Sequence, residues 1–169
     1  MASDTGTTEE AAASAARNRV FLVVVDDSPE RDVALRYACL RARKSGGRVA
    51  LLRVIEPADQ TEWAGVGALM QEEGREEAER LLSGLAAQVN EMTGGLPILL
   101  IREGDPRDEL LALIAEDPRI SILILAAAAE GSGPGPLIAA LTNRYASRVT
   151  VPMTIVPGGM DDEALERVT

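Results

Sequence analysis

Short apolar runs alternate along the chain with longer stretches of mixed polarity. The first run, Val-Phe-Leu-Val-Val-Val at residues 20–25, is mostly β-branched, which is typical of a strand buried on both faces. Similar runs follow, and the stretches between them repeat apolar residues at helical spacing. The predicted strands span 20–25, 49–55, 98–101, 120–125 and 151–156, and the predicted helices span 29–45, 68–91, 106–116 and 137–147.

Two helix starts carry recognisable capping signals. Ser28 is expected to be the N-cap of the first helix, with Pro29 as its first residue, where the missing N–H costs nothing. Asp105 is expected to cap the third helix, with Asp108 completing an Asp-x-x-Asp variant of the capping box. Both signals favour helices that directly follow strands.

Alternation of strands and helices predicts an α/β fold, an open parallel sheet with helices on both faces. Residues 1–18 lack apolar periodicity and are expected to form a mobile tail; the domain spans 19–157, and 158–169 form a C-terminal tail. In such sheets ligands bind at the carboxyl ends of the strands. The expected site therefore involves residues 26–28, residues 54–56 and the loop after Leu125.

The composition argues against binding to nucleic acid or to membranes. The chain has 169 residues, enough for one domain, and a formal charge of −10, so nucleic acid and anionic membranes are poor partners. Aromatic residues make up 2%, too few for a base-stacking surface. The sequence lacks an apolar run of the ~18 residues that a membrane span needs and lacks a signal-peptide pattern, so a cytoplasmic location is expected.

Missing residue types restrict the chemistry further. The sequence has no histidine, which removes the commonest general base and metal ligand. Cys39 is the sole cysteine and lies among apolar residues, so a small core residue is the favoured interpretation. Lys44 is the sole lysine and lies in the first predicted helix. These absences favour a non-catalytic protein without a metal.

An acidic pair, Asp26 and Asp27, follows the first predicted strand. A magnesium site of the phosphoacceptor receiver kind would also need an aspartate after the third strand and a lysine after the fifth, and the sequence has neither. Asp27 is then best explained by the favourable dipole at a helix N-terminus, while the role of Asp26 stays open.

A Gly/Pro-rich loop at residues 131–136 precedes the last predicted helix. It lacks a Gly-Lys-Ser/Thr sequence, which excludes a Walker-type phosphate loop. Pro134 and Pro136 each remove an N–H donor, and Glu130 adds negative charge. A simple connection is therefore favoured over a phosphate-binding loop.

Several motifs together resemble the universal stress protein family over residues 19–157. Val-Val-Val-Asp-Asp-Ser at 23–28 is similar to the family's first strand and its end, and Val-Pro-Met-Thr-Ile-Val-Pro at 151–157 to its closing strand. The segments 34–38 and 51–57 are similar to its first helix and second strand. The resemblance implies a Rossmann-like sheet of order 3-2-1-4-5. It also implies a homodimer through the fifth strand, with Val151, Met153 and Ile155 at the edge.

The resemblance also places a nucleotide motif. Nucleotide-binding members carry Gly, two residues, Gly, nine residues, then Gly-Ser or Gly-Thr after the fourth strand. Counting back from Pro157 puts these four positions on alanines, whose side chains are expected to block close backbone approach and, at positive φ, to add strain. Gly131 and Gly133 are substitutes only along a different backbone path. The four alanines are Ala126, Ala129, Ala139 and Ala140.

The expected function is a non-catalytic stress-response or regulatory module that lacks tight ATP binding and needs no cofactor. The alternative is a nucleotide-binding switch or slow ATPase that uses ATP with magnesium. By resemblance, Asp26 would then contact the ribose or adenine, and the backbone at Val54 would bind the adenine edge. An unidentified protein partner is compatible with the first function.

Overall fold

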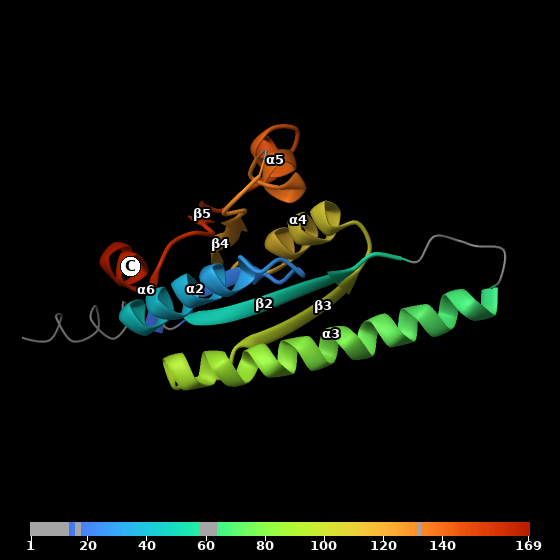
Figure 1. The fold of residues 1–169 in the computed structure, drawn as a ribbon, viewed down its shortest axis with the longest axis horizontal. Helices are drawn as coiled ribbons and strands as arrows, with labels where there is room; N and C mark the ends of the chain where they lie inside the picture. Colours follow the sequence, from blue (N-terminus) through green and yellow to red (C-terminus); the bar gives the residue numbers. More distant parts are fainter. Residues whose placement is uncertain (1–13, 16–17, 58–63, 132) are drawn as a thin grey trace, which may run out of the picture.

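A computed structural model describes residues 14–15, 18–57, 64–131 and 133–169 of the chain, and its centre is a five-stranded sheet (Figure 1). The strand order is β3-β2-β1-β4-β5, and every neighbouring pair is parallel. This confirms the predicted α/β class and strand order. The strands are β1 Val20–Val24, β2 Arg48–Ile55, β3 Ile98–Glu103, β4 Ile120–Ala127 and β5 Met153–Pro157.

Helices cover both faces of the sheet. One face packs against α2, α3 and α6, and the other against α4 and α5. The crossovers between parallel strands require this layering, because each one must carry the chain back over a face of the sheet. The helices are α2 Arg31–Ser45, α3 Ala64–Thr93, α4 Pro106–Glu116, α5 Pro136–Thr142 and α6 Asp162–Val168, with a short 3₁₀ helix, η1, at Ala146–Arg148.

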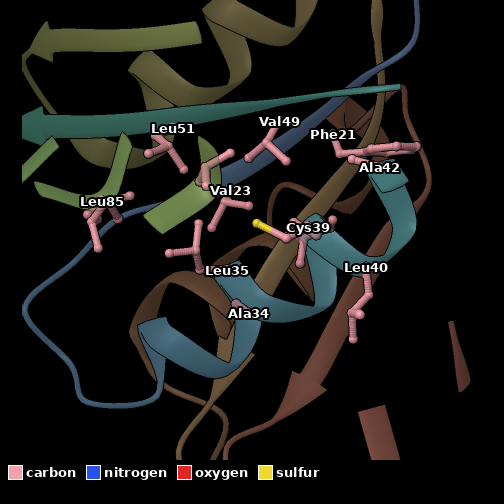
Figure 2. Packing of buried hydrophobic residues seen from close by; sticks show 14 of the residues in the cluster. Phe21, Val23, Ala34, Leu35, Cys39, Leu40, Ala42, Val49, Leu51 and Leu85 are labelled. Carbon is pink, nitrogen blue, oxygen red and sulfur yellow. The ribbon is translucent and has the colours of Figure 1, made fainter. Parts of the chain in front are cut away.

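Two aliphatic cores lie on the two faces of the sheet. In the first, Leu35 and Cys39 of α2 point toward Val23 of β1 (Figure 2). In the second, Leu22 of β1 packs with Leu110 and neighbouring residues of α4. Because successive strand residues point to opposite faces, an all-apolar strand supplies both cores at once. Burying each of these larger aliphatic side chains contributes about 1.5–3 kcal/mol.

The first helix begins later than the capping signal predicts. Helix α2 starts at Arg31, and Ser28 is not its N-cap. Ser28 instead donates from its N–H (3.1 Å) and its hydroxyl (2.7 Å) to the carboxylate of Asp26. This local turn holds Ser28 outside the helix, because aspartate competes for nearby backbone donors.

The cap at Asp105 is confirmed, but Asp108 does not complete the capping box: its carboxylate lies 3.5 Å from the Arg148 guanidinium. The Asp105 carboxylate accepts hydrogen bonds from the backbone N–H groups of Arg107 (2.9 Å) and Asp108 (3.4 Å), and Pro106 is the first helical residue. Its ion pair with the Arg107 guanidinium, supported by the backbone bonds, holds the pKa of Asp105 well below its ordinary value. The ionised form thus stabilises the first turn of α4.

The predicted helix at 137–147 is two elements. Helix α5 ends at Thr142, and η1 follows after a break. The side chains of Thr142 and Asn143 donate to the carbonyl groups of Ile138 (2.8 Å) and Ala139 (3.2 Å), and so bond to the last turn of α5. The fifth strand also starts later than predicted, at Met153, so Val151 lies outside it.

Residues 158–169, expected to be a C-terminal tail, contain helix α6. The Asp161 carboxylate caps this helix by accepting the N–H of Ala164 (2.8 Å), and Leu165 is buried in the first core beside α2. Arg36 of α2 pairs with Asp162 (2.9 Å). The predicted tail at residues 1–18 lies mostly outside the described residues. In the part of the chain that the structure describes, no helix is long and apolar enough to cross a membrane.

Candidate functional site

Two adjoining cavities lie at the carboxyl ends of the central strands, where the strand order predicts a site. The larger has a volume of about 440 Å³ and lies between the ends of β1 and β2, helix α3 and the starts of α4 and α5. The smaller, about 190 Å³, lies between the start of α2 and the loop that follows β4. Val24, Asp26, Pro136 and Leu137 line both, so together they form one cleft.

The backbone of Val54 faces the larger cavity. Leu52 accepts the N–H of Val25 (2.8 Å) from the β1 side, and Ile55 accepts the N–H of Gly104 (3.0 Å) from the β3 side. Since alternate residues of a parallel strand bond to opposite neighbours, Val54 directs its N–H and C=O toward β1. The β1–β2 pairing has ended by then. Val54 therefore offers a donor and an acceptor to a planar polar group in the cleft.

Asp26 stands where the two cavities meet. One carboxylate oxygen is held in the turn with Ser28, and its backbone carbonyl accepts a bond from the Arg31 guanidinium (3.0 Å). The side chain is thereby oriented at the mouth of the cleft. A carboxylate in this position is an acceptor for hydroxyl groups of a ligand.

The cleft is negatively charged. The acidic side chains that line the larger cavity are Asp26, Asp27, Glu56 and Glu77, against the single base Arg53. The guanidinium of Arg53 lies 2.8 Å from the Asp27 carboxylate and also donates to the carbonyl of Val25 (3.3 Å). Among the described residues, the one cation that lines the larger cavity is therefore already paired, and an anionic ligand there meets net repulsion.

The loop after β4 takes its tight turns at glycines. Gly131, Gly133 and Gly135 have φ values of 129°, 135° and 92°, whereas no described residue other than glycine has a positive φ. The strain that an alanine would have at positive φ does not arise here, since Ala126 is a regular strand residue paired with Val156.

A glutamate closes this loop from across the cleft. The Glu30 carboxylate, at the start of α2, accepts the backbone N–H of Ala129 (3.2 Å). Gly158 follows β5 and donates its N–H to the carbonyl of Ala127 (2.9 Å). A Cβ on Gly158 would stand 2.3 Å from Cγ of Glu30 and 2.6 Å from that carbonyl oxygen, so only glycine fits there.

Of the residues predicted to bind a nucleotide, Asp26, Val54 and Ala126 line the cleft. Ala129 lines neither cavity, but its backbone N–H is bonded to Glu30, which lines the smaller one. Four others do not line either cavity: Ala139 and Ala140 belong to α5, and Gly131 and Gly133 lie in the loop before it.

The residues missed by sequence reasoning are Glu30, Arg53 and Glu77. Arg53 lies inside a predicted strand, and its charge among apolar neighbours is the local signal that its side chain is not part of the apolar core. Glu77 lies in a charged run on α3 that has the pattern of a solvated surface, so no local signal identifies it.

The described part of the chain holds no group of three or more His, Cys, Asp or Glu residues placed to bind a metal ion. Cys39 lies in the first core, not in the cleft, and burial raises the pKa of its thiol to about 11. This confirms it as a core residue with little thiolate character near neutral pH.

Comparison with known proteins assigns the chain to a family. Residues 17–157 match the model of the universal stress protein family. No curated protein matches the chain.

Three solved structures share the fold. A universal stress protein UspA from Lactobacillus plantarum has a TM-score of 0.69 at 16% identity, covering 83% of this chain and 98% of that one. A protein of the same family from Burkholderia pseudomallei has a TM-score of 0.63 at 19% identity, covering 83% and 97%. A universal stress protein from Archaeoglobus fulgidus, solved in complex with dAMP, has a TM-score of 0.52 at 18% identity, covering 82% and 96%.

Proposed function

The chain belongs to the universal stress protein family, and on that basis we propose that it is a non-catalytic, dimeric stress-response or regulatory module without tight ATP binding. The observation that carries this proposal is the acidic lining of the cleft, and the alanines that the resemblance puts at the family's glycine positions support it. A cytoplasmic location and the absence of a cofactor belong to the same proposal.

The alanines remove contacts that a phosphate chain needs. Ala126 is engaged in the sheet with Val156, and Ala139 and Ala140 stand where glycine and a hydroxyl residue would be expected. The missing hydroxyl alone removes a hydrogen bond to a charged acceptor, about 1.5–3 kcal/mol. Because each 1.4 kcal/mol is tenfold in affinity, this weakens phosphate binding by roughly one to two decades.

The acidic lining acts in the same direction. A nucleotide triphosphate would bring several negative charges next to Asp26, Asp27 and Glu77, while Arg53 is already paired with Asp27. Bringing like charges together in a partly desolvated cleft raises the free energy of binding. A neutral ligand does not meet this penalty.

Dimerisation through β5 is the second part of the proposal. Strand β5 pairs with β4 alone, which leaves its other edge open, and the Ile155 side chain on it is 37% exposed. Uncovered apolar edges favour pairing with another strand. A two-fold arrangement that joins β5 of two copies would cover Met153 and Ile155, with Val151 just before the strand.

The alternative is a nucleotide-binding switch or slow ATPase that uses ATP with magnesium. The N–H and C=O of Val54, which have no β1 partner among the described residues, support it, because they suit the edge of an adenine ring. Asp26 is placed to accept from ribose hydroxyls. The dAMP complex of the Archaeoglobus fulgidus protein shows that a protein of this fold takes such a ligand.

Calorimetric titration of the purified protein with ATP and magnesium separates the two. We expect no binding tighter than about millimolar, because the phosphate contacts are missing. A micromolar isotherm would overturn the proposal in favour of the nucleotide switch. Identification of any small molecule released when the purified protein is denatured provides an independent measurement.

A further inference from the structure

We propose that Glu30 determines the charge selectivity of the cleft, by occupying with its own carboxylate the loop donor that an anion would otherwise use. This inference rests on the proposed function and deepens it, since it names the residue that disfavours the binding of phosphate groups.

The contact joins two distant segments. Glu30 is the residue before α2, yet its side chain makes no capping bond to that helix. Instead one carboxylate oxygen lies 3.2 Å from the backbone nitrogen of Ala129, in the loop after β4 and 99 positions along the chain. The Glu30 carboxylate could accept an N–H group at the start of its own helix, but it bonds to the loop instead.

The position of Glu30 is fixed by its neighbours. Its stem passes over Gly158, where a Cβ would stand 2.3 Å from the Glu30 Cγ and 3.1 Å from the Ala129 nitrogen. Gly158 is itself bonded to the carbonyl of Ala127 (2.9 Å). The three segments therefore meet closely, and the carboxylate lies against the loop within this packing.

For an anion in the smaller cavity, the contact has two consequences: the Ala129 N–H is no longer available as a donor, and a negatively charged carboxylate lies nearby. Backbone N–H groups in the turn after a strand commonly bind phosphate oxygens. Here the Ala129 N–H is satisfied internally, and Glu30 and Asp26 both line the smaller cavity. The lining cation, Arg31, donates to the Asp26 carbonyl and pairs with Asp32 (3.3 Å). A phosphate in the smaller cavity would have to displace the Glu30 carboxylate before it could reach the Ala129 N–H.

Two substitutions separate the charge from the hydrogen bond. Glu30→Ala frees the Ala129 N–H and removes the charge, whereas Glu30→Gln keeps an oxygen that accepts the N–H and removes the charge alone. The matched control is Glu130→Ala, which removes an exposed carboxylate from the same loop, one residue from Ala129.

Binding of ATP with magnesium is measured by NMR titration of the ¹⁵N-labelled protein, which reaches millimolar dissociation constants. We expect Glu30→Ala to bind about tenfold more tightly than the unaltered protein or more, since a hydrogen bond to a charged group contributes that much. The affinity of Glu30→Gln should lie between those two, and Glu130→Ala should change affinity by less than about threefold. Addition of ATP should shift the Ala129 resonance only in the variants in which Glu30 is replaced.

The outcomes are distinguishable. If Glu30→Ala binds ATP no more tightly than Glu130→Ala, the inference is wrong while the proposed function stands. If the unaltered protein already binds in the micromolar range, the proposed function fails, and the inference is judged by whether Glu30→Ala tightens binding further. Should Glu30→Ala fail to fold, Glu30→Gln decides the question by the same comparison with Glu130→Ala.

Discussion

Gly158 lies directly against Glu30, and a single added carbon on the glycine would stand 2.3 Å from the Cγ of that side chain. It would also stand 2.6 Å from the carbonyl oxygen of Ala127, a backbone atom that cannot rotate away. The glycine is therefore needed for close approach of three chain segments and not for an unusual backbone angle.

Replacing Gly158 with alanine should lower the free energy of unfolding by about 1–3 kcal/mol, the usual cost of overpacking. Urea denaturation followed by circular dichroism measures this. Gly159→Ala is the matched control, because nothing lies within 4 Å of a Cβ at that neighbouring glycine. Equal stability of the two variants would show that the contact is not tight.

Replacing Ile155 with lysine should convert the proposed dimer to monomers, because a charge would be buried at the β5 edge where two copies meet. Light scattering of the purified protein measures the mass. Leu99→Lys is the control: Leu99 is 42% exposed on β3, the opposite edge of the sheet. An unchanged dimer mass for Ile155→Lys, or loss of the dimer in Leu99→Lys, would contradict an interface at β5.

Burial of Cys39 predicts a pH dependence of stability. Its pKa rises from 9.0 to about 11 in the folded protein, because the apolar core disfavours the thiolate. Between these values the unfolded chain releases the proton while the folded chain keeps it. The free energy of unfolding should therefore fall as pH rises, by at most about 1.4 kcal/mol per pH unit.

Comparison with Cys39→Ala isolates this contribution, since all other titrating groups are common to both proteins. Urea denaturation at intervals between pH 8 and pH 11, a range chosen to span the titration, should show the unaltered protein losing stability faster than the variant. Parallel curves would mean that the thiol does not stay protonated in the folded core.

Helix α6 should contribute measurably to stability through one side chain. Leu165 is 1% exposed and packs beside α2, so Leu165→Ala should cost about 2–5 kcal/mol in unfolding free energy. Val168→Ala, on the same helix at 53% exposure, should change stability by less than about 0.5 kcal/mol. A small loss for Leu165→Ala would mean that α6 is only loosely docked on α2.

Strand β1 illustrates what can be predicted locally. Its unbroken apolar run specifies burial on both faces, because either face of a strand with that pattern requires a cover. The cap at Asp105 is equally local, since its bonds reach only two and three residues along the chain. Such features depend on neighbouring residues, and the sequence predicts them well.

Glu30 illustrates what cannot be predicted locally. Its partner is 99 residues away, and Ser28, two positions before it, carries the stronger capping signal. Helix α6 is a similar case, because seven residues are too short for a periodic pattern to stand out, and its stability comes from the contact of Leu165 with the first core.

The amino-acid sequence by itself determined the strand–helix alternation, the layering of the sheet and the end of the sheet at which a cleft must open, because these follow from periodicity and the handedness of crossovers. Only the tertiary structure decided which groups face that cleft. The pairing of Arg53 with Asp27 and the reach of Glu30 to Ala129 depend on segments that folding alone brings within hydrogen-bond distance.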